Sequence, residues 1–458
     1  WKQDTHRQFG TECIQLTYAA HKQGQLLNHL EKAVAARKNQ LELLPEEQSP
    51  IFHKLTDEQM LCTLHNSGKI TELAKIFSQL IGLYKAACLN NTLEKNVIVN
   101  STDPKQTEKA LALLKPILTA YETHLTAHND IDFEDMINKA LAYVQSGKFS
   151  APWRYIMVDE FQDISEPRAR LVKALRDNNK ECSIFAVGDD WQAIYRFSGA
   201  DLSLTTQFAT YFGATTQSTL DQTFRFNNQI GKVATHFISK NPVQIPKTIT
   251  SVKNVKGPAV SLLKRDNNPI NTQKTNVIDE LANGAIDDIL AAISAKACKP
   301  VSVYLLARFW FLLPSPTDIK RLNNQYPLLK IQTQSFHASK GKEADYVIIM
   351  GLKKGPHGFP SEKVTPALID ALLAKQEAYE YAEERRLFYV ALTRAKDRAY
   401  IIADMTDASR FVKELVDEHQ IQLDEFGSTA SQLFIDDINC LVCETGVLKK
   451  RTGRFGAF

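Results

Sequence analysis

The first part of the chain repeats its apolar residues at the spacing of helices. Apolar side chains return there every three or four positions, so that they line one face of a helix. Two such stripes are Leu26, Leu27, Leu30 and Ala33, and Ile70, Leu73, Phe77, Leu80 and Tyr84. This part has neither a strand pattern nor a cluster of reactive side chains. The pattern therefore predicts a helical packing subdomain over residues 1–129.

The pattern changes at about residue 130. Short apolar runs rich in β-branched residues now alternate with helical stretches, such as the helix predicted over Glu166–Asn178. Strands that alternate with helices indicate parallel sheets with both faces covered. The predicted strands are Arg154–Val158, Ser183–Val187, Val301–Ala307, Ile331–Phe336, Tyr346–Met350 and Ala399–Ile402.

These strands fall into two α/β blocks. A polar region rich in Asn and Lys, Lys247–Asn276, separates the early strands from the later ones. We expect the first block over residues 130–212 and the second over residues 213–408. A helix and linker are expected over residues 409–438, and a short tail over residues 439–458.

The composition is that of an ordinary globular protein. With 44% hydrophobic and 23% charged residues, the chain can build large cores, which excludes disorder throughout. The 19 Gly and 17 Pro residues are too few for a collagen-like protein. The formal net charge of +3 indicates no class of partner, because a nucleic-acid binder needs its basic groups gathered locally.

The cysteines and apolar runs indicate the compartment. The seven Cys are odd in number and mostly isolated, which argues against a secreted disulfide framework. The longest apolar runs are far shorter than the ~20 residues that a membrane span needs. We therefore expect a reduced, cytoplasmic protein with no membrane association. Because Trp1 falls inside a helical pattern and Phe458 inside a small motif, we also expect a fragment cut at both ends.

The first group of chemically active residues follows a predicted strand. The apolar run that ends at Val158 leads directly into Asp159 and Glu160. Ligands of open α/β sheets bind at the carboxyl ends of strands. An Asp at that place can hold Mg²⁺ beside phosphate oxygens, and a Glu can orient or deprotonate a water. The alternative is a solvated acidic turn.

The second group follows the next predicted strand. Gly188 makes a turn, two carboxylates follow, and Gln192 lies among the aromatic residues Tyr195 and Phe197. A Gln at a strand end can contact a γ-phosphate, and aromatic rings can stack on the bases of a single strand. The alternative is a hairpin whose aromatic residues belong to the core.

Three further motifs lie in the second block. Phe224 and Arg225 stand in the run LDQTFRFN, His337 and Glu343 in TQSFHASKGKEAD, and Arg394 in EERRLFYVALTRAK. Arginines of one block can reach phosphates held by the other, as arginine fingers do. Each motif alone also fits a solvated basic surface.

In their order along the chain, the five motifs resemble those of the UvrD/Rep family of superfamily 1 helicases. The run Gly188–Ala200, GDDWQAIYRFSGA, is the most specific of them, and the resemblance covers about residues 131–403. It implies an α/β fold with two RecA-like, P-loop NTPase-type lobes built on parallel sheets. It places the helical subdomain 1–129 inside the first lobe, and the spacing between Arg225 and Gln334 leaves room for a small accessory insertion or none.

The resemblance also implies a role for each matching residue. Asp159 would hold Mg²⁺, and Glu160 would position the attacking water. Gln192, Arg225 and Arg394 would contact the γ-phosphate. The other expected site residues are Phe224 on the adenine, Glu343 on the ribose, and Tyr195, Phe197 and His337 along single-stranded DNA.

The implied function is that of an ATP-dependent helicase that moves 3′ to 5′ on single-stranded DNA and acts at duplex junctions, with ATP and Mg²⁺ as cofactors. Its phosphate-binding loop should read G-x-x-x-x-G-K-[ST], and none of the Gly-Lys pairs here fits. The family carries this loop before the helical subdomain. We therefore expect the first lobe to be incomplete and the fragment to be inactive alone, while its full-length parent is active.

The tail carries a second, smaller motif. Cys440 and Cys443 form a C-x₂-C pair, which supplies two of the four ligands of a zinc site. The basic run Lys449–Arg454 follows it. The pair resembles the first half of a topoisomerase-type zinc ribbon, so we expect Zn²⁺ and DNA binding in the parent. In the fragment we expect an unmetallated tail.

Two other functions remain as alternatives. The chain could be the helicase part of a RecB-like helicase–nuclease, but the residues after Arg394 hold only a linker and the cysteine pair. It could also be a non-catalytic DNA-binding remnant, although drift is not expected to preserve all of the motif residues. A Walker A loop upstream of Trp1 would favour the helicase, and its absence would favour the remnant.

Overall fold

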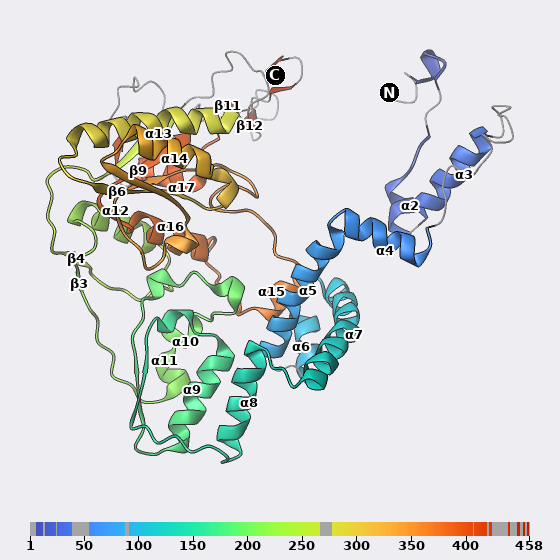
Figure 1. Cartoon of the computed structure of the whole chain (residues 1–458), viewed down its shortest axis with the longest axis horizontal. Coiled ribbons are helices and arrows are strands. Elements are labelled where there is room, and N and C mark those ends of the chain that lie inside the picture. Colours follow the sequence, from blue (N-terminus) through green and yellow to red (C-terminus); the bar gives the residue numbers. More distant parts are fainter. Residues whose placement is uncertain are drawn as a thin grey trace. The chain divides into compact units, whose positions relative to one another are not determined.

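We describe the protein from a computed structural model (Figure 1). The structure describes residues 6–11, 14–23, 25–38, 55–87, 91–265, 277–405, 407–418 and 421–423, and the residue pairs 438–439, 447–448, 452–453 and 456–457. The chain divides into two compact units, Trp1–Ser78 and Gln79–Phe458. The helical region predicted as one subdomain is thus shared between two units.

The first unit is helical. Its elements are α2 (Tyr18–Lys22), α3 (Leu26–Lys38), α4 (Asp57–Asn66) and the start of α5 (Lys69–Ala86), which continues into the second unit. Helix α4 begins with a capping box, in which the Thr56 hydroxyl accepts from the Gln59 amide and the Gln59 side chain accepts from the Thr56 amide. Helix α5 confirms the second predicted stripe, although Leu73 on that stripe is exposed.

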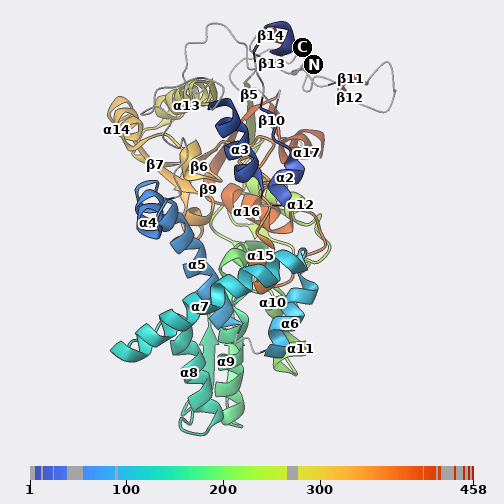
Figure 2. The same cartoon turned by 90° about the vertical axis from the view of Figure 1, so that its right-hand side faces the viewer.

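The second unit opens with further helices. These are α6 (Asn91–Asn100), α7 (Pro104–His128) and α8 (Phe133–Gln145). Asn129 ends α7 in the left-handed conformation, and Asp132 caps α8. Helices α6 and α7 contact α15 (Ala367–Leu372), as both views show (Figure 1, Figure 2). The helical region is therefore attached to a segment that comes nearly 240 residues later in the chain.

The first sheet has two parallel strands, β1 (Tyr155–Val158) and β2 (Ser183–Ala186), joined by α9 (Glu166–Asn178). Helix α9 packs beside α8 (Figure 1). One face of the sheet contacts a small core around Phe161 and Phe212. The other face, with Tyr155, Met157 and Phe185, is exposed, although parallel sheets normally have both faces covered.

Short elements connect the first sheet to the second. They are α10 (Ser203–Thr206), α11 (Phe208–Phe212), β3 (Gln222–Thr223), α12 (Asn228–Ile238) and β4 (Thr250–Ser251). The Asn227 side chain caps α12 and donates to the carbonyls of Lys396 and Asp397. This buried amide ties the start of α12 to the start of β9 (Ala395–Asp404), an interior strand of the second sheet.

The second sheet has six parallel strands in the order β10-β5-β9-β8-β6-β7. The strands are β5 (Val260–Arg265), β6 (Val301–Ala307), β7 (Leu329–Ser335), β8 (Ala344–Ile349), β9 (Ala395–Asp404) and β10 (Gln422–Leu423). The helices between them are α13 (Val277–Lys296), α14 (Pro316–Gln325), α15, α16 (Ala382–Leu392) and α17 (Arg410–Glu418). The short pairs β11 (Ile438–Asn439) with β12 (Val447–Leu448) and β13 (Thr452–Gly453) with β14 (Gly456–Ala457) follow.

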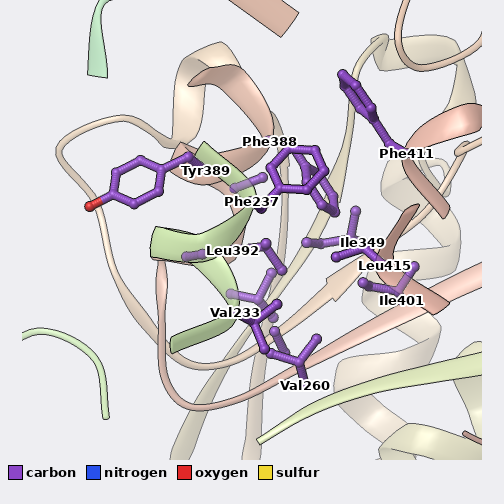
Figure 3. Packing of buried hydrophobic residues seen from close by; sticks show 14 of the residues in the cluster. Val233, Phe237, Val260, Ile349, Phe388, Tyr389, Leu392, Ile401, Phe411 and Leu415 are labelled. Atoms are coloured by element: carbon purple, nitrogen blue, oxygen red, sulfur yellow. The ribbon is translucent and has the colours of Figure 1, made fainter. Parts of the chain in front are cut away.

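Both faces of this sheet are buried. Successive residues of β9 alternate between the two cores, with Ile401 on one face and Tyr400 and Ile402 on the other. Helices α12, α16 and α17 cover the first face, and α13 and α14 cover the second (Figure 2). Figure 3 shows the first core, in which Phe237, Phe388 and Phe411 meet over the strands.

The α/β class and its parallel sheets are confirmed, and so are the six predicted strands within one or two residues at most ends. Strand β5 was not predicted, because its residues lie in the region that we interpreted as a polar separator. Its polar residue Ser261 is fully buried and accepts from the Arg398 guanidinium, so a side-chain partner offsets the cost of burial.

Candidate functional site

Two acidic residues stand where β1 ends. Glu160 has left-handed backbone angles (φ 49°), which are uncommon for a residue with a side chain. This turn lets the Glu160 amide donate to Asp159 Oδ1 at 2.8 Å. The buried Gln162 side chain donates to Glu160 Oε2 at 2.5 Å. The carboxylates are thus presented at the carboxyl end of the strand and held by local hydrogen bonds.

The turn after β2 packs directly on this acidic turn. Gln162 Oε1 accepts from the Asp189 amide at 2.8 Å, so one amide side chain joins both turns. Gly188 lies so close that a Cβ there would be 2.8 Å from Gln162 Oε1. Gln192 follows in a short 3-10 helix (Asp190–Gln192) and donates to Asp189 Oδ2 at 2.6 Å.

The opposing group comes from the second sheet. Arg394 lies between α16 and β9 and is fully buried. Its guanidinium donates to the carbonyls of Val390 at 2.9 Å and Lys342 at 3.2 Å, and to Gln192 Oε1 at 3.4 Å. Burial, with nearby Arg225 as the second cause, lowers the pKa of Arg394 to about 10. The group stays charged at neutral pH in a place where an anion would stabilise it.

Arg225 belongs to the same positive cluster. It follows β3, and its Nε lies 3.8 Å from Glu343 Oε2. Glu343 also pairs with Lys396 at 2.7 Å. Phe224, next to Arg225, is 77% exposed. Two guanidinium groups therefore converge beside an exposed ring and a carboxylate, an arrangement that can hold phosphates, a flat base and a sugar hydroxyl.

Three aromatic side chains, two from the first block and one from the second, lie together. The ring centroids of Tyr195 and Phe197 are 5.9 Å apart, and His337 lies 5.3 Å from Phe197. The Tyr195 hydroxyl donates to the His337 carbonyl at 3.4 Å. Phe197 is half exposed, so its ring can stack on a base. Burial, helped by Arg308, lowers the pKa of His337 to about 4, which keeps that ring neutral.

A buried cluster fixes Gln192 against the second sheet. Trp191 packs edge-on against Tyr389 with 5.5 Å between ring centroids, and its Nε1 donates to the Ile245 carbonyl. Asp190, also buried, accepts from Gln244 at 2.7 Å and from Lys247 at 2.7 Å. The residues next to Gln192 thus belong to the core of the second block, so Gln192 faces both blocks.

Among the predicted catalytic and DNA-contacting residues, the structure brings Gln192 into contact with Arg394, and Tyr195 and Phe197 into contact with His337. Gln192, Tyr195 and Phe197 come from the first block, and Arg225, His337, Glu343 and Arg394 from the second. The prediction omitted Lys340, whose ammonium contacts the first block at Asp163 and Gln192. A lone Lys in a polar run carries no sequence signal for such a contact. The ion pair between the buried Asp190 and the partly buried Lys247 was also not predicted.

The donor atoms at the first turn suit a magnesium ion. Asp159 and Glu160 both carry exposed carboxylates beside a strand end, and oxygen ligands of this kind are those that Mg²⁺ prefers. Within the described residues there is no cluster of three or more His, Cys, Asp or Glu side chains arranged to hold a metal. Cys440 and Cys443, the expected zinc ligands, lie outside the described residues.

None of the described helices combines enough length with enough apolar character to cross a bilayer.

Comparison with known proteins gives two family matches. Residues 5–213 match the UvrD/REP helicase N-terminal domain, and residues 315–406 match the UvrD-like helicase C-terminal domain. These ranges contain all of the predicted site residues except Phe224 and Arg225, which fall between them, and Cys440 and Cys443, which follow them. The resemblance inferred from the motifs is confirmed.

Individual relatives agree with this result. The chain is 42% identical over 307 residues to DNA helicase IV of Escherichia coli, a match that covers 67% of this chain and 42% of that protein. It is 26% identical over 319 residues to a "Probable DNA helicase" of Mycoplasma pneumoniae (66% and 55%). It is 32% identical over 136 residues to the ATP-dependent DNA helicase Rep of E. coli (29% and 20%). The chain therefore spans about half the length, or less, of these relatives.

Proposed function

Because the chain belongs to the UvrD/REP helicase family, we propose that it is the motor part of an ATP-dependent helicase that moves 3′ to 5′ along single-stranded DNA and separates strands at duplex junctions. The single observation that carries this proposal is the contact between Arg394 and Gln192. It supports a nucleotide site with carboxylates on one wall and guanidinium groups on the other.

Each wall has its own task in this proposal. Asp159 holds Mg²⁺, which neutralises charge on the phosphate oxygens when it is bound. Glu160 orients the attacking water. Arg225 and Arg394 stabilise the charge that develops on the γ-phosphate, and Gln192 contacts the same phosphate.

The remaining side chains contact the adenine and ribose of ATP and the bases of the DNA strand. Phe224 stacks on the adenine, for which its high exposure is suited, and Glu343 accepts from the ribose. Tyr195, Phe197 and His337 stack along the DNA strand. Stacking tolerates every base, which suits a motor that moves over any sequence. A neutral His337 supports this role, because a buried charge there would favour phosphate over bases.

We further propose that residues outside this chain complete the first lobe. The exposed face of β1 and β2 supports this, because Tyr155, Met157 and Phe185 together form an apolar surface on a two-stranded parallel sheet. No G-x-x-x-x-G-K-[ST] loop occurs in the sequence. Such a loop, supplied by the full-length protein, holds the phosphates, and the 458-residue chain alone hydrolyses no ATP.

The cysteine pair has a separate proposed role. Cys440 and Cys443 supply half of a zinc site that a longer chain completes, and the basic residues after them contact DNA. Metal analysis of both chains tests this: we expect one equivalent of zinc in the full-length protein and none in the 458-residue chain. Zinc bound stoichiometrically by the shorter chain would contradict the proposal.

We also propose that the protein works in the cytoplasm.

The test of the proposed function uses the full-length protein and its Glu160→Gln variant. We expect ATP hydrolysis that single-stranded DNA stimulates, and a loss of roughly 10²-fold or more in turnover by the variant, with DNA binding retained. The matched control is Glu181→Gln, a change of an exposed carboxylate in the same block, which should leave turnover unchanged. DNA binding by the wild type without any hydrolysis would instead favour a non-catalytic remnant.

A further inference from the structure

Lys340 occupies an unusual place for a lysine. It follows a 3-10 helix (His337–Ser339) at the end of β7, and only 8% of its side chain is exposed. The next residue, Gly341, has φ +77°, a conformation that glycine adopts without strain. The chain therefore reverses direction immediately after Lys340, and the side chain of Lys340 points inward while Lys342 stays exposed.

The Lys340 ammonium contacts three groups of the first block. It donates to Asp163 Oδ2 at 2.5 Å and to the Gln192 carbonyl at 2.9 Å. It also lies 3.6 Å from Glu160 Oε2. Two of these three residues, Glu160 and Gln192, belong to the proposed nucleotide site. A single cation of the second block thus contacts the acidic turn and the backbone of the Gln192 turn together.

The same ammonium also contacts the aromatic cluster. It lies 5.0 Å from the centroid of the Tyr195 ring, within the range of a cation–π interaction. The hydroxyl of that ring donates to the carbonyl of His337, which stands in the turn that carries Lys340. A movement of Lys340 relative to the acidic turn would therefore move His337 relative to Tyr195.

The balance of charge around Lys340 depends on what else binds nearby. Burial raises the pKa of Asp163, and the hydrogen bond from Lys340 opposes that shift. The second oxygen of Asp163, Oδ1, is buried and has no hydrogen-bond partner among the described residues. One ammonium therefore only partly satisfies this acidic group. A magnesium nucleotide at Glu160 and Gln192 would change the charges that Lys340 faces.

We propose that Lys340 is the positioning residue that couples occupancy of the nucleotide site to the geometry of the aromatic cluster that holds DNA. This rests on the proposed function, and it adds a residue through which the two sites act on each other. Lys340 contacts neither substrate. It acts by holding Gln192 and Glu160 on one side and Tyr195 with the His337 turn on the other.

Coupling of this kind is measured as a ratio of affinities. We suggest measuring the Kd of the full-length protein for a fluorescein-labelled oligothymidine by anisotropy, first without nucleotide and then with saturating AMP-PNP and Mg²⁺. If two sites are coupled, the nucleotide changes this Kd, typically by about 5- to 150-fold. We expect such a change in the wild type and a ratio near 1 in Lys340→Met. A structural role alone would move both Kd values together and leave their ratio unchanged.

Lys342→Met is the matched control. It makes the same change two residues away on an exposed side chain, and it should keep the wild-type ratio. If Lys340→Met does not fold, Asp163→Asn provides the second variant, because it removes the partner that holds the ammonium, and its ratio should also fall toward 1. A wild-type ratio in Lys340→Met, or in folded Asp163→Asn, would overturn the coupling role. A wild type that binds neither DNA nor nucleotide would instead overturn the proposed function itself.

Discussion

The Arg394 guanidinium donates to the side chain of Gln192 at 3.4 Å, and the two residues lie on opposite α/β blocks of the chain. Gln192 is fixed by its hydrogen bond to Asp189, and Arg394 by the carbonyls of Val390 and Lys342. Each side chain therefore also makes hydrogen bonds within its own block. This is the geometry that a site shared between two blocks requires.

Arg394 is also poised for an anion. It is fully buried, and the charged group that lowers its pKa most is another cation of the second block, Arg225. A buried guanidinium beside a second one is costly unless negative charge arrives. The depressed pKa of Arg394, about 10, expresses this cost. The γ-phosphate of the proposed substrate would relieve it.

Replacement of Gly188 by alanine should displace Gln162 and with it the catalytic Glu160. The new Cβ would lie 2.8 Å from Gln162 Oε1, and Gln162 also holds Glu160. We expect turnover of the full-length protein to fall about 10-fold or more and stability to fall by ~1–3 kcal/mol. The control is Gly284→Ala, at a helical position with open space, which should stabilise slightly. Unchanged turnover in Gly188→Ala would show that the Gln162 contacts do not position Glu160.

Removal of the Phe197 ring should weaken DNA binding. The ring is half exposed beside Tyr195 and His337, and stacking on one base is worth ~1–3 kcal/mol. We expect the Kd of Phe197→Ala for oligothymidine to rise by about 5- to 150-fold, measured by fluorescence anisotropy. Phe133→Ala removes an exposed ring on α8 and should leave the Kd unchanged. Equal affinities of the wild type and Phe197→Ala would exclude a stacking role.

His337 should make stability depend on pH in a defined window. Its pKa falls from 6.5 in the unfolded chain to about 4 in the fold, chiefly because the ring is buried. Between these values the unfolded chain binds the proton more readily, so the contribution of His337 is present above pH 6.5 and is lost as the pH falls toward 4. A shift of this size corresponds to about 3 kcal/mol.

Urea unfolding of the 458-residue chain at several pH values tests this expectation. The free energy of unfolding of the wild type should fall more steeply between pH 6.5 and 4 than that of His337→Gln, which has no titrating ring. Parallel curves for the two proteins would mean that His337 titrates normally in the fold.

The ion pair of Arg385 and Glu414 should stabilise the first core of the second sheet, which contains Phe237 and Phe411. Arg385 donates to both carboxylate oxygens of Glu414, at 2.7 and 2.8 Å, and to the Phe237 carbonyl at 2.8 Å. Glu414→Gln would leave the buried guanidinium without its charge partner, which costs about 3–5 kcal/mol. Glu418→Gln, on an exposed carboxylate of the same helix, should cost under ~1 kcal/mol. Similar urea midpoints for the two variants would contradict this account.

Much of the fold was predictable because strands of a parallel sheet are continuously apolar. The runs at Val301–Ala307 and Tyr346–Met350 carry that signal plainly, and both are strands. Strand β5 was missed because Ser261 interrupts its apolar run, and only the distant Arg398 makes that residue acceptable inside. A local pattern cannot reveal a partner that the fold brings from more than 100 residues away.

The candidate site, like the fold, was predictable only where the signal lies in the local sequence. The sequence motifs indicate phosphate and metal chemistry for Asp159, Gln192 and Arg394. The structure brings Gln192 and Arg394 into contact. Lys340 also stands in one of these motifs, but only the structure shows that its ammonium is buried against Asp163. The sequence likewise gives no sign that Trp191 packs into the first core of the second sheet, because an aromatic residue after a turn fits a base-stacking site equally well.

The most direct test of a shared nucleotide site is the turnover number of the full-length protein with Arg394→Lys. Lysine keeps the positive charge but loses the planar fork that reaches Val390, Lys342 and Gln192 together. With Arg321→Lys as the surface control, we expect kcat for DNA-stimulated ATP hydrolysis to fall roughly 10²- to 10³-fold while the melting temperature changes little. A kcat within twofold of the wild type would contradict the claim that the two blocks share one triphosphate.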